Sequence, residues 1–366
     1  MAAAFVYDDR LLGYDFGPTH PLRPRRLRLT YELLRDYGAV REVVAPRAAR
    51  EEEILAVHDG RYVDAVAAIG RGERLANHEE FGFGMGDNPP FAGVYDAALL
   101  YCGAALTAAE LVLSGKVRVA FSPSGGLHHA QPSRASGFCV FNDPAVVLHR
   151  LRQEVTRAVY IDIDAHHGDG TQVMFYDDPS VMTISIHETG ETLYPQTGFP
   201  EEIGEGAGAG YAVNIPLFPG TDDATFLRAF TTIVPPLIHA YRPDVIVAQL
   251  GCDTHHEDPL SHLCLTTRGF RELVRIIDGL CDRWVALGGG GYNIRTVPRA
   301  WTLAYEVMSG QELPDEVPEP FKSRYGTHRL HDPHPVRAGE MAERVRTYAD
   351  ASIAAVQRLV FPYHGL

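Results

Sequence analysis

The chain has 366 residues, of which 45% are hydrophobic, and its formal net charge at neutral pH is −14. This length and apolar fraction suffice for one large α/β domain. The negative charge disfavours binding to a nucleic-acid backbone, and the absence of an uninterrupted apolar run of about 18 residues argues against a membrane span.

The cysteines and the first residues bear on the cellular compartment. Five cysteines without a CxxC pair argue against a disulfide framework and against a thiolate zinc site. The opening MAAAFVYDDR lacks the basic and then apolar pattern of a secretory signal. We therefore expect a cytoplasmic protein with neither a nucleic-acid nor a membrane partner. The sequence gives no indication of the oligomeric state.

Short β-branched runs alternate with longer amphipathic stretches, as expected for a mostly parallel sheet with helices on both faces. The predicted strands are residues 3–7, 117–121, 158–164, 181–186, 245–249 and 284–287. The predicted helices are residues 25–37, 90–114, 144–152, 222–241 and 267–280.

The glycine-rich stretch 204–210 is interpreted as a flexible connection. Residues 311–337, rich in proline, histidine and charge, predict an irregular surface meander before a last helix at 338–360. Because no linker divides the chain, we expect one domain over residues 1–366. Its core would span about residues 3–310, with the meander and last helix at 311–366.

Four predicted strands run directly into polar residues that can carry chemistry. The motifs that follow strands 117–121, 158–164, 245–249 and 284–287 are SPSGGLHHA, HHGDG, LGCDTHH and GGGGYN. In an open parallel sheet the carboxyl ends of the strands share one edge, where ligands bind. We therefore expect histidine, aspartate and tyrosine side chains to meet at that edge.

Two aspartates of the second motif predict a metal site. Asp162 and Asp164 lie on the same face of a buried strand, which is costly unless cations or hydrogen-bond donors compensate them. His166 follows closely, and Asp253 ends another strand. Two carboxylates and one imidazole leave positions open for water and substrate, as in a catalytic zinc site, although iron(II) or another divalent ion would also fit. The alternative, turn capping or salt bridges, suits an isolated DxD better than this combination.

The neighbouring motifs could supply a proton carrier and an oxyanion donor. His128 and His129 could deprotonate a water and protonate a leaving amine. Asp162 and Asp169 are candidates to fix the tautomers of these rings. Tyr292 follows four glycines, and its phenol could stabilise an oxyanion. The glycines are not a phosphate loop, because no Lys-Ser/Thr follows, and no G-x-S-x-G elbow indicates a serine hydrolase.

In combination and order, these motifs resemble the class I-like histone deacetylase family, particularly its bacterial acetoin-utilisation-type members. The resemblance covers about residues 6–307 and includes HPLRPRRLRLTYELL, SGGLHHA, SGFCVFND, DIDAHHGDGTQ, VMTISIH, QLGCDT and LGGGGYNIRTVPRAW. It implies a single arginase/deacetylase-like domain with a sheet of about eight strands. It also implies zinc-dependent removal of acetyl groups from N-ε-acetyl-lysine, with release of acetate.

The resemblance assigns roles at the chemical centre. The zinc ligands would be Asp164, His166 and Asp253. The catalytic residues would be His129 as general base and acid, His128 as its electrostatic partner, Asp162 and Asp169 behind the two rings, and Tyr292 on the acetyl carbonyl.

The resemblance also assigns residues around the substrate. Those that would line or border the acetyl-lysine tunnel are Asp87 at the rim, Phe138 and Tyr194 in the walls, Leu260 at the mouth, and Gly137 and Gly290. Eukaryotic members usually carry phenylalanine in place of Tyr194, which makes this tunnel slightly more polar. Arg26 would line an internal acetate-release channel.

Potassium is a further cofactor that the resemblance implies. The ligands of the first site would be Asp162, Asp164, His166, Ser185 and Ile186. Those of a second, more peripheral site would be Phe175, Asp178, Val181 and Tyr211. By contrast, His255 and His256 have no role in the resemblance and are expected to be exposed at the rim.

The substrate stays open between acetylated proteins and small acetylated amines such as polyamines. The resemblance suggests metabolic enzymes such as acetyl-CoA synthetase as partners. A more distant alternative is a ureohydrolase with two manganese ions about 3.5–4 Å apart, which needs a second carboxylate cluster. A module that binds acetyl-lysine without cleaving it is a third alternative, disfavoured by the intact base and oxyanion donor.

Overall fold

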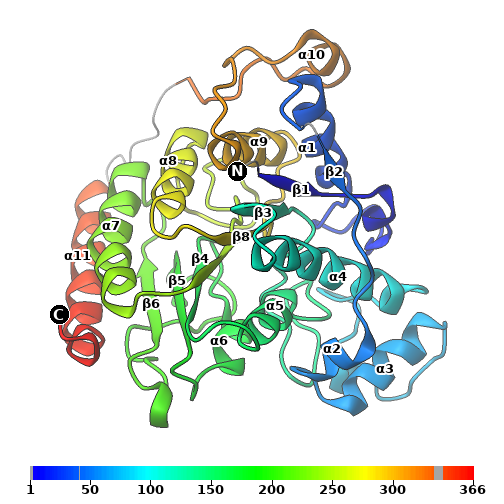
Figure 1. The fold of residues 1–366 in the computed structure, drawn as a ribbon, viewed down its shortest axis with the longest axis horizontal. Coiled ribbons are helices and arrows are strands. Elements are labelled where there is room, and N and C mark those ends of the chain that lie inside the picture. The colour runs from blue at the N-terminus through cyan, green and yellow to red at the C-terminus, as the bar shows by residue number, and fades with distance from the viewer. Residues whose placement is uncertain (1–2, 41, 334–340) are drawn as a thin grey trace.

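The computed structural model describes residues 3–40, 42–333 and 341–366. Its centre is an eight-stranded sheet in the order β2-β1-β3-β8-β7-β4-β5-β6, in which every pairing is parallel (Figure 1). The strands are β1 (Ala4–Val6), β2 (Val43–Val44), β3 (Val119–Ser122), β4 (Ala158–Asp162), β5 (Val181–Glu188), β6 (Ala212–Leu217), β7 (Val245–Gln249) and β8 (Trp284–Leu287). The predicted single α/β domain with a parallel sheet is confirmed.

Helices cover both faces of this sheet. The α-helices of the described chain are α1 (Arg25–Asp36), α2 (Glu51–Leu55), α3 (Gly60–Gly70), α4 (Val94–Leu113), α5 (Asp143–Leu151), α6 (Asp169–Met174), α7 (Asp223–Tyr241), α8 (Thr267–Asp278), α9 (Thr296–Ser309), α10 (Glu319–Tyr325) and α11 (Ala342–Leu359). On one face, α4 packs against β1, β3 and β8, and α5 against β4 and β7 (Figure 1). On the other face, α1, α9, α8 and α7 form a row of neighbours, and α11 packs against α7 and the edge strand β6.

One helix of the described chain, α4, is long and apolar enough to cross a membrane by length and composition. Most of its apolar window is buried inside the protein, where it covers the sheet. Burial against β1, β3 and β8 accounts for its apolar character, as for any core helix.

Several predicted boundaries differ from the structure. β2 and β6 were not predicted, and α10 lies inside the segment 311–337 that was expected to be irregular. Residues 334–337 of that segment and 338–340 of the predicted last helix lie outside the described residues. β4 ends at Asp162 rather than at residue 164, because the backbone N–H of Asp164 turns to donate to Asp162 Oδ1 at 3.1 Å.

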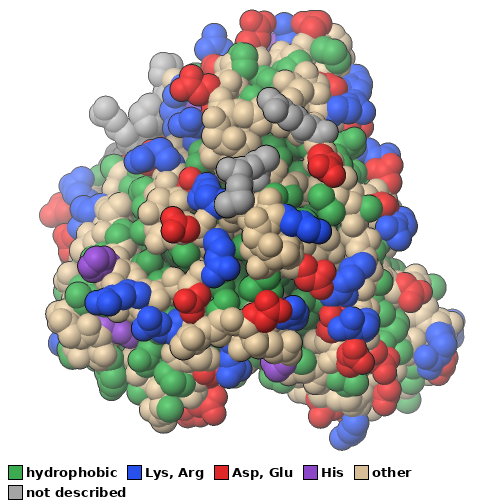
Figure 2. Space-filling view, in the orientation of Figure 1, with side chains coloured by type: hydrophobic (Ala, Val, Ile, Leu, Met, Phe, Trp, Pro, Cys, Tyr) green, Lys and Arg blue, Asp and Glu red, His purple; other side chains and the backbone are tan. Residues whose placement is uncertain are grey.

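The surface carries both signs of charge. On the face shown in Figure 2, the Lys and Arg side chains are interspersed with Asp and Glu. On that face the described side chains form no continuous basic track of the kind that follows a nucleic-acid backbone.

Candidate metal and catalytic site

The loops after β3, β4, β7 and β8 meet at the carboxyl edge of the sheet, as the strand order requires. Asp162 at the end of β4 lies in register with Gln249 at the end of β7, and Gln249 is in register with Leu287 at the end of β8. The strands therefore end level with one another. The side chains that follow them are delivered to one place.

The three predicted metal ligands come together there. One donor atom from each of Asp164, His166 and Asp253 lies within 4.8 Å of the other two, and all three residues are buried. His166 Nδ1 lies 3.0 Å from Asp164 Oδ1 and 3.0 Å from Asp253 Oδ2. The three donor atoms surround one point.

This donor set fits a divalent cation. Two buried carboxylates face a single imidazole, so negative charge is in excess. Burial, followed by repulsion from Asp164, raises the pKa of Asp253 to about 7. A cation would relieve both penalties. A Cβ on Gly290 would lie only 2.1 Å from Asp253 Oδ2, so glycine leaves the carboxylates the room that they occupy.

Backbone and amide donors orient the two carboxylates. Asp164 Oδ2 accepts hydrogen bonds from Gln249 Nε2 and from the backbone N–H of Gly290, each at 2.7 Å. Asp253 Oδ1 accepts the backbone N–H of Ala165 at 2.8 Å. The remaining carboxylate oxygens are the ones that lie near His166. Gln249 was not predicted as a site residue, although its place at the end of β7 was a usable signal.

The two neighbouring histidines are each held by a carboxylate. The Nδ1–H of His128 donates to Asp162 Oδ2, and that of His129 donates to Asp169 Oδ1, both at 2.7 Å. These bonds turn the two Nε2 atoms toward each other at 3.1 Å. The pairing is the one predicted for the four residues.

The pKa values of the two rings move in opposite directions. Burial favours the neutral form of both. For His129, burial and then the charge on His128 lower the pKa to about 4. For His128, the carboxylates of Asp162 and Asp164 outweigh burial and raise the pKa to about 9. At neutral pH the pair therefore consists of a charged ring beside a neutral one that can accept a proton.

Two further side chains support these carboxylates. The Tyr160 hydroxyl donates to Asp162 Oδ2 at 2.8 Å, and Gln131 Nε2 donates to Asp169 Oδ2 at 2.7 Å. Neither was predicted. Tyr160 could have been found, because it precedes Asp162 by two residues on β4 and so shares its face.

Tyr292 is anchored through its backbone. Its N–H donates to Asp258 Oδ2 at 2.7 Å, while Asp258 Oδ1 accepts the N–H of Leu260 at 3.0 Å. Asp258, also not predicted, thus ties the half-buried Leu260 to the tyrosine. Burial, and then the carboxylates of Asp253 and Asp164, hold the pKa of Tyr292 well above its usual value. The phenol keeps its proton and can act as a donor.

The predicted wall residues lie beside this centre. The Phe138 ring is 5.7 Å from the Tyr292 ring at 80°, and the Tyr194 ring is 5.1 Å from the His129 ring at 80°. A Cβ on Gly137 would lie 2.5 Å from His129 Cδ2. Glycine is therefore required between the wall and the histidine.

Two surface depressions border the walls. One, of about 290 Å³, is lined by the exposed Asp87 together with Gly137 and Tyr194. The other, of about 370 Å³, includes the exposed Arg23 and Arg25 and reaches Tyr292. Asp87 thus lies at the rim and not in the buried centre.

Arg26 lies on the inner side of the glycine loop. It is buried, its guanidinium donates to the Gly291 carbonyl at 3.0 Å, and it stacks 5.1 Å from the centre of the Trp301 ring. With Tyr14 and Leu22 it lines a cavity of about 20 Å³. A buried cation beside a small cavity is compatible with the predicted acetate channel.

The potassium predictions fall on backbone already engaged in the fold. Ser185 is in register with Asp162 on the neighbouring strand, and Ile186 follows it in β5. At the second site the carbonyl of Phe175 accepts the N–H of Asp178, the carbonyl of Asp178 accepts that of Val181, and the carbonyl of Tyr211 accepts that of Thr183. Each carbonyl has a second lone pair, so both sites stay predictions.

His255 is not exposed at the rim as expected. It is buried, and its ring Nε2 lies 2.8 Å from Asp332 Oδ2. The C-terminal segment that carries Asp332 folds back over this loop, which residue spacing could not predict. His256 is half-buried, with its Nδ1 3.1 Å from the Leu265 carbonyl.

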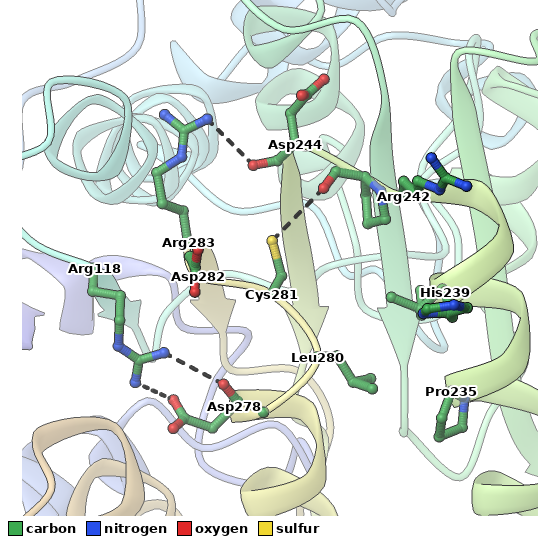
Figure 3. Close-up of a pocket in the computed structure, with 13 residues that line it drawn as sticks. Arg118, Pro235, His239, Arg242, Asp244, Asp278, Leu280, Cys281, Asp282 and Arg283 are labelled. Atoms are coloured by element: carbon green, nitrogen blue, oxygen red, sulfur yellow. Dashed lines mark hydrogen bonds and ion pairs between the residues drawn. The ribbon is translucent and has the colours of Figure 1, made fainter.

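A separate cavity of about 930 Å³ opens where β3, β7 and β8 begin, at the sheet edge away from this centre (Figure 3). Among its charged groups, Arg118 pairs with Asp278, and Arg283 donates to the Asp244 carbonyl (Figure 3). None of the predicted site residues lines it.

Known proteins are similar to this chain in sequence and in fold. The histone deacetylase domain matches residues 20–308. The acetoin utilization protein AcuC of Bacillus subtilis is 44% identical over 326 residues, covering 86% of this chain and 84% of that protein. The AcuC protein of Staphylococcus aureus strain MSSA476 is 43% identical over 321 residues, covering 85% of this chain and 82% of that protein.

Solved structures with a similar fold indicate the same family. The crystal structure of a histone deacetylase homologue from Aquifex aeolicus superposes with a TM-score of 0.89 at 33% identity, covering 96% of this chain and 100% of that one. A histone deacetylase homologue complexed with SAHA has the same TM-score at 34% identity and the same coverage. The chain is therefore a member of the histone deacetylase family, of the bacterial acetoin-utilisation type.

Proposed function

We propose that this deacetylase hydrolyses N-ε-acetyl-lysine in proteins, releases acetate and uses one zinc ion. The observation that carries the proposal is the convergence of the Asp164, His166 and Asp253 donor atoms within 4.8 Å of one another. The paired histidines lie beside them, and their Nε2 atoms are 3.1 Å apart.

A divalent ion held by Asp164, His166 and Asp253 would supply Lewis acidity, polarising an amide carbonyl and making a water a stronger acid. Zinc suits two carboxylates and an imidazole with open positions, and iron(II) is the alternative. Potassium would be an auxiliary ion, bound at the first potassium site by Asp162, Asp164, His166, Ser185 and Ile186.

The chain's own residues carry the protons. His129 accepts a proton from the attacking water at Nε2, because Asp169 already holds its Nδ1–H. It then delivers that proton to the departing lysine amine. The charged His128 beside it favours this delivery, and the Tyr292 phenol donates to the oxyanion that forms from the acetyl carbonyl.

The charge at the rim favours a peptide over a polyamine. The exposed Arg23 and Arg25 lie in the depression that reaches Tyr292. They would repel the ammonium groups of an acetylpolyamine. A peptide can instead pair its backbone N–H groups with Asp87 on the other side of the walls.

The same proposal includes a cellular location and partner proteins. All five cysteines are free thiols, which supports a cytoplasmic location. Acetylated metabolic enzymes such as acetyl-CoA synthetase are the proposed partners, with no role for nucleic acid or a membrane.

Relative turnover tests the choice of substrate. We expect kcat/KM for an acetyl-lysine peptide to exceed that for acetylspermidine. The double variant Arg23→Ala and Arg25→Ala should reduce this difference in kcat/KM, because it removes the repulsion between the two arginines and the ammonium groups of acetylspermidine. If the parent protein instead turned over acetylspermidine faster, the proposed substrate would be wrong, and the protein would be an acetylpolyamine amidohydrolase.

A further inference from the structure

A hydroxyl-to-hydroxyl hydrogen bond links the wall residue Tyr194 to Ser136. Their oxygens are 2.5 Å apart. Ser136 is buried, whereas Tyr194 is 40% exposed, so the bond joins a partly exposed ring to a buried group. Phenylalanine at this position could not make the bond.

The serine end of this link is rigid. The backbone N–H of Ser136 donates to Cys139 at 3.0 Å, and that of Cys139 donates back to Ser136 at 2.8 Å. Between them, Gly137 and Phe138 have φ angles of +50° and +70°, so they form a tight turn. The Phe138 carbonyl also accepts the Tyr14 hydroxyl at 2.8 Å. The same turn therefore contains the wall residue Phe138 and the serine that binds the other wall residue, Tyr194.

The loop that carries Tyr194 is fixed independently of this bond. His187 Nε2 lies 3.0 Å from the Gly198 carbonyl, and His167 Nδ1 lies 2.8 Å from Thr197 Oγ1. These buried imidazoles hold the backbone beyond Tyr194. Within the described residues, the Tyr194 hydroxyl has only Ser136 as a protein partner. Losing the bond should therefore free the ring and leave the loop in place.

The position of the ring relates directly to the acyl group. Tyr194 meets His129 edge to face at 5.1 Å, and a Cβ on Gly137 would lie 3.0 Å from Tyr194 Cε1. These contacts place the ring directly beside the turn and the histidine. An acyl group longer than acetyl needs the ring to move outward, which would stretch the bond to Ser136.

We propose that the Ser136–Tyr194 hydrogen bond sets the width of the tunnel beside His129 and makes the enzyme selective for short acyl groups. The inference rests on the proposed deacetylation. Ser136 acts as a positioning residue through Tyr194. A neutral hydrogen bond contributes a factor of roughly 2–10 to an equilibrium, and that is the size of discrimination expected.

Acyl-chain preference in a double-mutant cycle tests this inference. Ser136→Ala, Tyr194→Phe and the double variant are compared on acetyl-, propionyl- and butyryl-lysine peptides of one sequence. We expect each single variant to raise the butyryl-to-acetyl ratio of kcat/KM by roughly 2–10-fold, mainly through KM for the longer acyl groups. The double variant should match either single variant, because both remove the same bond.

The matched control removes another hydroxyl hydrogen bond from the same loop. Thr192 Oγ1 donates to Glu188 Oε1 at 2.9 Å, outside the tunnel walls, so Thr192→Val should keep the parent ratio. Unchanged ratios in both single variants, or effects that add in the double variant, would overturn the inference.

Failure of the proposed function is recognised separately in the parent protein. If the parent prefers acetylspermidine, the double-mutant cycle is measured on N-acylspermidines. The same changes in the butyryl-to-acetyl ratio of kcat/KM are then expected. A parent inactive on both amines would refute the proposed function and this inference with it.

Discussion

At the scale of single residues, His128 and His129 illustrate how environment divides two identical side chains. They are adjacent in sequence and both are buried, yet their pKa values are about 9 and about 4. The difference arises because His128 faces two carboxylates, Asp162 and Asp164, whereas His129 faces Asp169 and the charge of its neighbour. A neutral ring next to a charged one is the state that a proton-accepting base needs.

Removing the base should abolish most of the activity. We expect His129→Ala to lower kcat for an acetyl-lysine peptide by about 10²–10⁴-fold and Tyr292→Phe by about 10²–10³-fold. Both variants should retain metal, because neither side chain is a proposed ligand. Acetate release and metal content are measured on the same samples. Turnover at the parent rate in either variant would refute the role assigned to that residue and would favour a site that binds acetyl-lysine without cleaving it.

Gln249 should determine metal affinity without touching the metal. Its Nε2 donates to Asp164 Oδ2 at 2.7 Å, so Gln249→Leu leaves that oxygen short of one donor. Loss of such a support typically weakens metal binding by about 10–100-fold. A competition titration of the variant against a chelator gives the affinity. Parent-like affinity would mean that Gly290 alone orients the carboxylate.

The sequence was sufficient to predict residues in the loops that follow strands, such as Asp164 after β4 and Asp253 after β7, because the carboxyl ends of the strands in a parallel sheet share an edge. It was not sufficient for Asp258 or Ser136, whose contacts depend on the paths of loops, which no local spacing encodes. Gln249 was missed although its place at the end of β7 was a usable signal.

At the scale of elements, β6 and α10 show where pattern reasoning fails. β6 contains Pro216 and the buried Asn214, which break the expected apolar run. It forms because it is the edge strand, where a missing N–H costs little. α10 is short, and Phe321 packs with Leu33 and Leu303 in a second apolar cluster that only the tertiary fold creates.

The C-terminal segment is fastened to the site loops by Asp332. Its Oδ2 lies 2.8 Å from His255 Nε2 and accepts the N–H of Thr267 at 2.8 Å, and its Oδ1 pairs with Arg299. Although burial opposes ionisation, these donors hold the pKa of Asp332 far below its usual range. One carboxylate thus joins the loop after β7, the start of α8 and helix α9.

Asp332→Ala should destabilise the fold by about 3–5 kcal/mol, because it leaves buried partners unpaired. The parent gains this stability above the ordinary aspartate pKa of about 4 and loses it as pH falls below that value. Urea unfolding at several pH values measures the difference between parent and variant. The difference should shrink toward low pH. A constant difference would show that the carboxylate contributes through packing rather than charge.

At the scale of the whole molecule, the fold separates support from chemistry. The proposed ligands, the histidine pair and Tyr292 all follow the carboxyl ends of strands near the middle of the sheet. The cavity where β3, β7 and β8 begin includes the Arg118–Asp278 ion pair and none of these residues (Figure 3). The strand order, which alternates segments distant in sequence, is what gathers the site from four loops.

We propose that one divalent ion, held by Asp164, His166 and Asp253, supports amide hydrolysis. Titrating zinc into chelator-treated protein while measuring acetate release from an acetyl-lysine peptide tests it most directly. We predict that activity is lost with the chelator, returns to a plateau at one zinc per chain, and does not return in Asp253→Ala. Acetate release that persists without metal would contradict the account, as would a requirement for two manganese ions per chain with release of urea.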